Sequence, residues 1–265
     1  MSIPEAYLLA LPVLLAAGVV AWLASLWLND VSFVDSLWPL FFVLAALVFA
    51  MDALPLAPAG ILALVLLTVW AVRLSAHITV RNWGEPEDSR YQQIRENNQP
   101  GFRFKSLYIV FGLQGLLAWI ISIPLLYAVT TTSAPGPLHI AAAALWLVGF
   151  VFEAGGDWQL MQFRKNRESS KAVLNSGLWR YTRHPNYFGD ACIWWSFWLF
   201  AVAAGAWWTV YAPLLMSFLL LKVSGVAMLE KTIGSRRPEY ADYIERTSAF
   251  IPMPPRKLAG DNKGS

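Results

Sequence analysis

Residues 59–80 read AGILALVLLTVWAVRLSAHITV, an apolar stretch interrupted only by Arg73, His77 and small polar side chains. A helix needs roughly 20 mostly apolar residues to cross a bilayer, because lipid offers no partner for an exposed backbone group. Pro58 stands before the stretch, where proline suits the first turn of a helix, and a charged loop begins at Arg81. These residues predict a membrane-spanning helix.

Six further stretches of the chain have the same character. We predict seven spanning helices, at Tyr7–Leu28, Phe33–Met51, Ala59–Val80, Lys105–Val129, Leu138–Phe163, Tyr187–Ala204 and Trp207–Leu229. The composition agrees, since 57% of the residues are hydrophobic, 14% are charged and the mean hydropathy is +0.48. We therefore predict an all-α membrane protein, with residues 1–256 forming a single transmembrane domain and residues 257–265 a disordered polar tail.

The basic residues predict the orientation of the helices. Of the 20 lysines and arginines, Arg73 and Lys222 fall inside predicted spans, and the other 18 lie in residues 81–105, 164–183 and 231–263, with Lys105 at the very start of the fourth span. With seven spans these three segments share one side of the membrane. The positive-inside rule then places the N-terminus outside and the C-terminus in the cytoplasm. We expect a multi-pass protein of a bacterial inner membrane.

The segment from Arg164 to His184 has six basic side chains against one acid, Glu168. Residues 177–190 read GLWRYTRHPNYFGD, so a glycine turn leads into polar residues before Pro185 opens an apolar helix. The N-terminal end of a helix attracts anions, as do clustered arginines. This pattern predicts a phosphate site, with anionic lipid headgroups or simple positive-inside anchoring as alternatives.

Three acids lie within or beside the apolar stretches that flank this segment. Asp190 is about one turn into the helix that Pro185 opens, and Glu153 and Asp157 share one face of the preceding helix at a spacing of four residues. An acid in lipid is costly unless it is paired. We expect a charge-paired cavity, in which Asp190 meets ribose hydroxyls or an arginine, and structural ion pairing is the alternative.

Two other segments on the predicted cytoplasmic side are rich in polar groups. Residues 81–91, RNWGEPEDSRY, have turn-forming residues and mixed charge, and this loop could fold over a ligand. In residues 230–252, Tyr240 and Tyr243 have helical spacing and offer stacking and hydroxyl contacts. A juxtamembrane amphipathic helix is the simpler interpretation of the second segment.

Several familiar sites are excluded by the sequence. It has no Gly-x-Gly-x-x-Gly after a strand, no Walker loop and no zincin helix, so a soluble nucleotide-binding fold does not hold the cofactor. The single cysteine, Cys192, excludes an intramolecular disulfide and a zinc site with paired thiolates. We predict no metal site and no nucleic-acid partner.

The string WRYTRHPNYFG at residues 179–189, followed by Glu230-Lys231 and EYADYIERTSAFIP at 239–252, resembles bacterial membrane proteins related to the steroid 5-alpha-reductase family. The likeness extends upstream to DSLW at 35–38 and RNWGE at 81–85. The Arg-His-Pro-x-Tyr core is shared with isoprenylcysteine carboxyl methyltransferases, which bind S-adenosylmethionine. This shared core leaves open whether the chain binds S-adenosylmethionine or the cofactor of the reductases, NADPH.

The likeness to the reductases implies that NADPH lies in a cytoplasm-facing cavity and gives hydride to the beta carbon of an alpha,beta-unsaturated ketone. It implies cofactor contacts for the matching residues, in which arginines would favour the 2′-phosphate of NADPH. The implied cofactor residues are Asp157, Arg164, Tyr181, Asn186 and Asp190, joined by Asn82, Arg183, His184, Glu230, Arg236 and Tyr240.

The group that would bind the substrate ketone is Asp35, at the start of the second predicted helix. Animal members of the reductase family carry a glutamate in helix 2 and a tyrosine in helix 3, and this chain has no tyrosine in its third predicted span. If burial kept Asp35 protonated, it could donate to the enolate oxygen. The alternatives are that Asp35 only caps its helix, or that Arg73 and His77 take part.

Two other functions stay open beside the reductase. An S-adenosylmethionine-dependent methyltransferase would need a nucleophile held in line with the methyl group but no acid for the ketone. A lipid-binding or transport protein would explain a cavity but not the tyrosine and arginine strings. Six basic residues before the sixth helix favour a phosphate-rich cofactor, so we expect an NADPH-dependent reductase whose steroid-like or isoprenoid-like substrate enters from the membrane lipids.

Overall fold

The computed structural model describes the chain apart from Met1, Asp52, Glu168 and residues 170–171, 224–238 and 257–265. The described residues form helices and loops without a strand, which confirms the all-α class for that part of the chain. Its contacts divide it into two compact units. The first unit comprises residues 1–140 and 197–212, and the second comprises residues 141–196 and 213–265.

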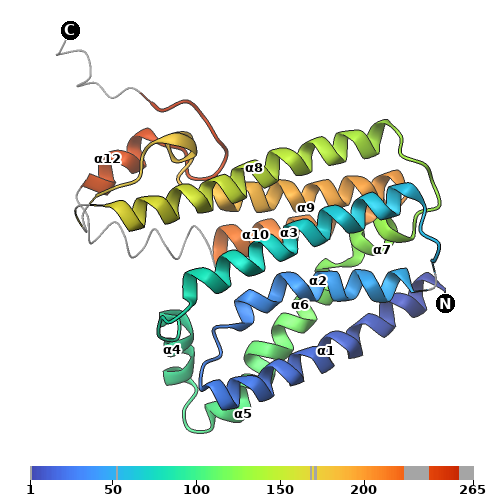
Figure 1. The fold of residues 1–265 in the computed structure, drawn as a ribbon, viewed down its shortest axis with the longest axis horizontal. Helices are drawn as coiled ribbons and strands as arrows, with labels where there is room; N and C mark the ends of the chain where they lie inside the picture. Colours follow the sequence, from blue (N-terminus) through green and yellow to red (C-terminus); the bar gives the residue numbers. More distant parts are fainter. Residues whose placement is uncertain (1, 52, 168, 170–171, 224–238, 257–265) are drawn as a thin grey trace. The chain divides into compact units, whose positions relative to one another are not determined.

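The first unit is built on three long helices that follow one another in the chain. They are α1 (Ile3–Leu28), α2 (Val34–Ala50) and α3 (Pro58–Asn82), and α2 packs against both of its neighbours (Figure 1). Glycines allow the closest approaches. A Cβ atom at Gly60 would lie 2.3 Å from the carbonyl oxygen of Val129, and one at Gly18 would lie 3.2 Å from that of Phe111.

The fourth predicted span is not one regular helix. It consists of α5 (Phe102–Ser106), a π-helical turn η1 (Leu107–Gly112), α6 (Leu113–Ile121) and α7 (Ile123–Thr130). Pro124 lies in the first turn of α7, and the helix is interrupted just before it, at Ser122. A proline has no N–H to give to the preceding turn, so the break has an identifiable cause.

The connection between α3 and α5 contains a short helix that the predicted spans did not include. This helix, α4 (Ser89–Asn97), begins after Asp88, whose carboxylate accepts a hydrogen bond from the backbone N–H of Arg90. Its Tyr91 is buried in a cluster with Val31, Val34 and Phe102. Most of the predicted polar loop, residues 83–88, is turn and loop, and its last three residues begin α4, which packs within the first unit.

The second unit is organised around α8 (Pro137–Asn166) from Ala141 onward and α9 (Pro185–Ala203) as far as Ser196. These helices approach closely, since a Cβ atom at Gly189 would lie 2.3 Å from the backbone nitrogen of Glu153. The described residues of the unit also include the 3-10 turn η2 (Gly177–Arg180), the part of α10 (Tyr211–Phe218) from Pro213 onward, η4 (Leu219–Val223) and α12 (Glu239–Arg246).

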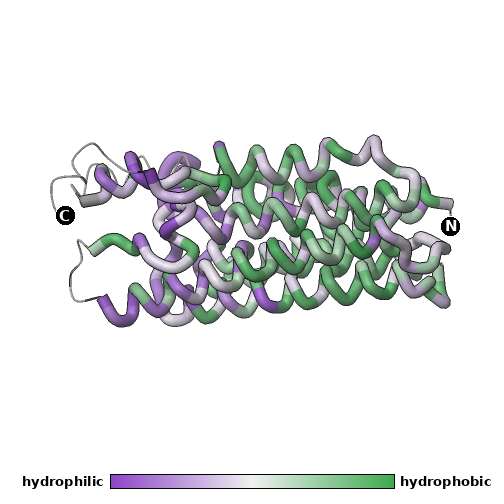
Figure 2. The backbone as a smooth tube through the Cα atoms, turned by 90° about the horizontal axis from the view of Figure 1, so that it is seen from above, coloured by the Kyte–Doolittle hydropathy of each residue, from purple (hydrophilic) through white to green (hydrophobic). Residues whose placement is uncertain are grey.

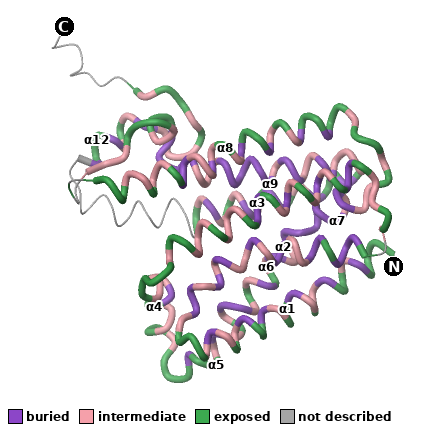
Figure 3. The backbone as a smooth tube through the Cα atoms, viewed as in Figure 1, coloured by how far each residue is buried: buried purple, intermediate pink, exposed green. Residues whose placement is uncertain are grey.

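Among the described residues, four helices are long and apolar enough to cross a membrane: Ile3–Leu28, Pro58–Asn82, Phe102–Ile121 and Pro137–Asn166. The middles of the helices are mainly hydrophobic, and much of the hydrophilic sequence lies at their ends and in the connections (Figure 2). Large apolar side chains such as Leu8, Val20 and Val151 are exposed on α1 and α8 (Figure 3). In a soluble protein such surface would be unfavourable, so these faces indicate contact with lipid.

Helices occupy the described part of all seven predicted segments, but the remaining three segments are shorter or less apolar than the four candidate spans. The number of seven spans and the orientation of the termini therefore stay predictions. The polar tail predicted at residues 257–265 and the end of the last predicted helix, beyond Val223, lie outside the described residues.

Candidate functional site

The turn between α1 and α2 places Asp35 in the first turn of α2. Asn29 ends α1 in the left-handed conformation, with φ of 56°. The carboxylate of Asp30 then accepts hydrogen bonds from the backbone N–H and the hydroxyl of Ser32, both at 2.7 Å. The turn is thereby fixed by its own side chains, and Asp35 points to neighbours from other helices.

Three side chains donate hydrogen bonds to the carboxylate of Asp35. Tyr91 Oη donates to Oδ1 at 2.5 Å, and Arg90 Nη2 donates to Oδ2 at 2.8 Å. Gln114 Nε2 donates to the hydroxyl oxygen of Tyr91 at 3.1 Å and to Oδ1 of Asp35 at 3.4 Å. We refer to Asp35, Asp88, Arg90, Tyr91 and Gln114 as the Asp35 cluster.

Asp88 belongs to the Asp35 cluster because it binds Arg90, which contacts Asp35 directly. The carboxylate of Asp88 accepts from Arg90 Nε at 2.9 Å, while the other end of the guanidinium reaches Asp35. Arg90 therefore bridges two carboxylates with one planar group, a geometry that lysine could not reproduce. A guanidinium thus contacts one oxygen of Asp35, and two further donors contact the other.

Burial and charge make Tyr91 a neutral hydroxyl donor. Burial raises the pKa of Tyr91 far above its ordinary value, and the negative charge of Asp35 raises it further. Burial alone would lower the pKa of Arg90, but its hydrogen bond with Asp88 and its attraction to Asp35 outweigh burial and raise that pKa. Tyr91 therefore keeps its proton, and Arg90 its charge, across the physiological pH range.

The helix that carries Tyr91 is anchored to the α1–α2 turn by Glu87. One oxygen of Glu87 accepts from the backbone N–H of Val31 at 2.9 Å and from Arg95 at 2.7 Å, and the other accepts from Arg95 at 2.9 Å. Burial opposes the ionisation of Glu87, but these bonds outweigh it and lower the pKa of the carboxyl. The ionised side chain thus holds α4 in place.

The Glu87→Gln variant is expected to loosen α4 in a pH-dependent way. A carboxyl whose pKa is lowered by folding stabilises the fold above its unfolded pKa of about 4.3, and this stabilisation disappears as the pH falls through the folded value. Amide hydrogen exchange in α4 should therefore be faster in the variant near pH 7 and converge with the unaltered protein below about pH 4.

Glu85→Gln is the matched control for this experiment, because Glu85 is exposed and two residues away. It should leave the exchange of α4 unchanged at every pH. Equal protection of α4 in the Glu87→Gln and unaltered proteins near neutral pH would show that Glu87 does not anchor the helix.

Of the Asp35 cluster, sequence reasoning singled out Asp35 alone. It placed Tyr91 in a loop that could fold over a ligand, and it found no tyrosine in the third span to accompany the acid. The structure supplies that hydroxyl from α4. Gln114 had a sequence signal that was not used, since it is an amide inside the apolar stretch of the fourth span. Arg73 and His77, the weaker alternatives, lie in α3 and are partly buried.

In the second unit, Asn186 and Asp157 connect α9 to α8. Asn186 Nδ2 donates to Asp157 Oδ1 at 3.1 Å, where a Cβ atom at Gly156 would lie only 3.1 Å from the backbone nitrogen of Asn186. The Oδ1 atom of Asn186 is buried and has no hydrogen-bond partner among the described residues. A buried acceptor of this kind suits a donor from a bound ligand. Two other buried acids, Glu153 and Asp190, lie on the same two helices.

The basic string before α9 is held by the segment that contains α12. Arg183 is buried, and its Nη1 donates to the carbonyl oxygens of Ile244 and Thr247, both at 2.8 Å. Tyr243 Oη donates to the carbonyl of Trp179 at 2.5 Å. Residues 179–183 are thus joined to residues 243–247, and Arg183 caps the C-terminal end of α12.

The other predicted cofactor residues have varied surroundings. His184 is buried and stacks on Tyr187, with ring centroids 5.6 Å apart, and Tyr240 is buried against Tyr243. Arg164 and Tyr181 are exposed. Asn82 ends α3 in the first unit and accepts a hydrogen bond from Arg81. Glu230 and Arg236 lie outside the described residues.

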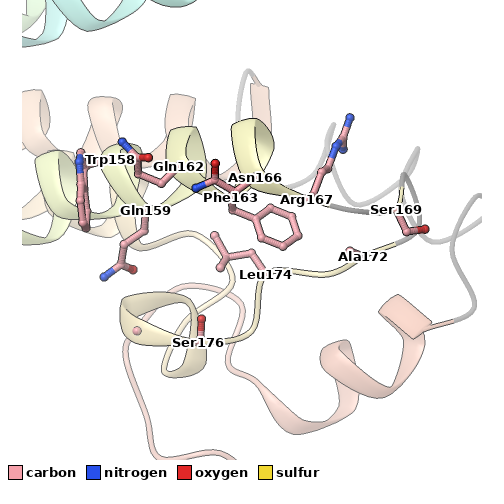
Figure 4. A pocket seen from close by; sticks show the side chains of 11 residues that line it. Trp158, Gln159, Gln162, Phe163, Asn166, Arg167, Ser169, Ala172, Leu174 and Ser176 are labelled. Carbon is pink, nitrogen blue, oxygen red and sulfur yellow. The ribbon is translucent and has the colours of Figure 1, made fainter.

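A cleft of about 640 Å³ lies between the end of α8 and the segment before η2 (Figure 4). Amide side chains from α8, Gln159, Gln162 and Asn166, line it together with Trp158 and Phe163. These residues lie on the side of α8 away from Glu153 and Asp157, as helical spacing requires. The lining contains none of the predicted cofactor residues.

Comparison with known proteins gives matches to both uncharacterized and characterised chains. An uncharacterized protein of Schizosaccharomyces pombe is 26% identical, over 89% of this chain and 76% of the yeast protein. The 3-oxo-5-alpha-steroid 4-dehydrogenase 1 of Mus musculus is 36% identical over 23% of this chain and 24% of its own length. The same enzyme of Bos taurus is 33% identical over 25% and 29%.

The chain thus spans only about a quarter of the length of the mammalian dehydrogenases that it matches, so their likeness to it is distant and local. No solved structure matches. The family model described as "Protein of unknown function (DUF1295)" matches residues 21–247, which include the Asp35 cluster and every predicted cofactor residue. The chain belongs to the DUF1295 family.

Proposed function

We propose that this membrane protein reduces the C=C bond of an alpha,beta-unsaturated ketone in a lipophilic, steroid-like substrate, with NADPH as the source of hydride. The observation that carries this proposal is the hydroxyl–carboxylate pair of Tyr91 and Asp35, at 2.5 Å. The distant similarity to 3-oxo-5-alpha-steroid 4-dehydrogenases supports the same class of reaction.

The chemistry of an enone explains why such a pair is useful. When hydride adds to the beta carbon of an enone, negative charge develops on the carbonyl oxygen, and a donor placed at that oxygen lowers the barrier. The enolate then takes up a proton from solvent at its alpha carbon. Tyr91 donates its single proton to Asp35 in the structure, and this proton would turn from Asp35 to the carbonyl oxygen when a substrate binds. The assignment changes the role expected of Asp35 from proton donor to orienting acceptor, with Tyr91 as the donor.

The cofactor is assigned to residues of the second unit, and the contact of Asn82, at the end of α3 in the first unit, stays a proposal from the resemblance. The buried, unsatisfied Oδ1 of Asn186 fits a ribose hydroxyl or a carboxamide N–H, and Arg164 at the end of α8 fits a phosphate. When bound, NADPH supplies the hydride. We propose that Arg183 stabilises the C-terminal end of α12, because its Nη1 donates to the carbonyl oxygens of Ile244 and Thr247. The remaining proposed contacts are Asp157, Tyr181, His184, Asp190, Glu230, Arg236 and Tyr240.

The proposal includes the membrane topology. Seven spans with the basic segments in the cytoplasm place Tyr91 and Arg164 on the side where NADPH is available. The apolar exposed faces allow a lipophilic substrate to enter from the bilayer. We propose a multi-pass protein of a bacterial inner membrane, whose cofactor side faces the cytoplasm.

The alternative is an S-adenosylmethionine-dependent methyltransferase. The Arg-His-Pro-x-Tyr core at residues 183–187 supports it. Two observations favour the reductase instead: a methyl transfer has no carbonyl that needs the Tyr91–Asp35 pair, and the basic cluster suits a cofactor with phosphates better than one with a carboxylate.

Titration of the purified protein with each cofactor tests the proposal. NADPH should raise the unfolding temperature in detergent, and Arg164→Ala and Asn186→Ala should each weaken binding about 10- to 100-fold through loss of a charged or buried hydrogen bond. Lys165→Ala is the matched control, since Lys165 is the exposed basic neighbour of Arg164. Stabilisation by S-adenosylmethionine alone would reject the reductase and favour the methyltransferase.

A further inference from the structure

Gln114 is a polar side chain in an apolar helix. It lies in the first turn of α6, within the candidate span Phe102–Ile121. An amide in this environment is unfavourable unless its hydrogen bonds are made inside the protein. Its Nε2 makes them with Tyr91 Oη at 3.1 Å and Asp35 Oδ1 at 3.4 Å, so the side chain belongs to the Asp35 cluster and not to the lipid face.

The side of the helix on which the Gln114 side chain lies depends on the π-helical turn that precedes α6. The π-helical turn η1 ends at Gly112, two residues earlier. An extra residue in one turn rotates everything after it by roughly 100° relative to a continuous α-helix. Trp38 Nε1 donates to the backbone carbonyl of Gln114 at 3.3 Å and helps to fix the new direction. Isolated π turns are frequent at functional sites.

We infer that Gln114 is a positioning residue that acts through the hydroxyl of Tyr91. Its N–H donates to Tyr91 Oη, and the phenolic proton is then directed away from it, at Asp35. A hydroxyl that accepts a hydrogen bond becomes a stronger donor, because the two bonds polarise each other. Gln114 thereby strengthens Tyr91 as a donor, to Asp35 in the structure and to a substrate carbonyl oxygen once the phenolic proton turns from Asp35 to it. This inference rests on the proposed function.

The groups that face Gln114 are few. Asp35 comes from α2, Arg90 and Tyr91 come from α4, and Asp88 caps α4 and binds Arg90. Where α1 packs on the adjacent Gly115, its nearest atoms belong to Leu14 and Leu15. A carboxyl placed at position 114 would lie beside the carboxylate of Asp35, and two such groups share a site only when one is protonated.

Two substitutions separate the donor role of Gln114 from its volume. Gln114→Met keeps a similar length without a donor, and Gln114→Glu has a donor only when it is protonated. With NADPH and progesterone as the probe enone, Gln114→Met is expected to lower kcat by about 10- to 100-fold at every pH, with a smaller change in KM. Gln114→Glu should match Gln114→Met near pH 8 and recover toward the unaltered rate as the pH falls.

Gln162→Met is the control, since Gln162 lines the cleft of the second unit and should leave kcat and its pH dependence unchanged. A Gln114→Met protein with the kcat of the unaltered protein would overturn the inference. So would a Gln114→Glu protein whose rate is equal to that of Gln114→Met from pH 5 to pH 8.

A second measurement does not depend on turnover. The nine tyrosines can be replaced by 3-fluorotyrosine, and the ¹⁹F resonance that disappears in Tyr91→Phe belongs to Tyr91. Gln114→Met should shift this resonance, because the hydroxyl loses the N–H that it accepts from. An unchanged resonance would overturn the role of Gln114. If the resonance moves but the unaltered protein does not reduce progesterone, the inference about Tyr91 stands and the proposed reaction fails for this substrate.

Discussion

Tyr91→Phe is expected to lower kcat for progesterone reduction by about 10²- to 10³-fold, the loss typical of removing one donor at a developing oxyanion. The ring would stay, so the packing of the buried side chain against Val31 and Phe102 should change little. NADPH binding should be unchanged, because the proposed cofactor contacts lie on other elements. Steady-state kinetics and a cofactor titration on the same preparation measure both effects.

Tyr108→Phe is the matched control for this variant, because Tyr108 lies on the nearby turn η1 and is 63% exposed. It should keep the full rate. Asp35→Asn should also lower kcat and spare NADPH binding, since an amide can accept from Tyr91 but removes the charge that pairs with Arg90. If Tyr91→Phe kept full turnover, Tyr91 would not be the donor.

Arg183→Met is expected to destabilise the second unit by about 2–6 kcal/mol, because it leaves the carbonyls of Ile244 and Thr247 without the donor that reaches both. A loss of this size corresponds to a fall in the unfolding temperature of roughly 5 to 20 °C. The methionine retains the apolar length of the side chain, so the loss reports on the hydrogen bonds. Thermal unfolding in detergent without cofactor measures it.

Arg180→Met serves as the control, since Arg180 is an exposed arginine in the same string. It should unfold within a few degrees of the unaltered protein. If Arg183→Met unfolded at the same temperature as Arg180→Met but lost NADPH affinity, Arg183 would act on the cofactor and not on α12.

The helices could be predicted from the sequence because apolar stretches of membrane length have few alternatives. Residues 59–80 were predicted as a span, and α3 runs from Pro58 to Asn82. The π turn at Leu107–Gly112 was not predicted. A π turn has no residue signature of its own, because it results from packing against neighbouring helices.

The family resemblance singled out Asp157 and Asn186, and the structure joins these two residues, 29 positions apart, at 3.1 Å. Tyr91 and Gln114 were not singled out, because their connection to Asp35 spans 56 and 79 residues and depends on how α4 docks. No periodicity in one sequence reports such a contact. The same holds for Arg183, whose Nη1 donates to carbonyls 61 and 64 residues away at the end of α12.

The proposed reaction is tested most directly by following the hydride. Protein in lipid nanodiscs would be incubated with progesterone and NADPH that carries deuterium at C4 of the nicotinamide, on either face in turn. The product of one of the two forms is expected to be the saturated ketone with one deuterium on the former beta carbon, and this product should be nearly absent with Tyr91→Phe. Unreacted progesterone with both forms, together with methyl transfer from S-adenosylmethionine to a lipophilic acceptor, would contradict the assignment of the chain as an enone reductase.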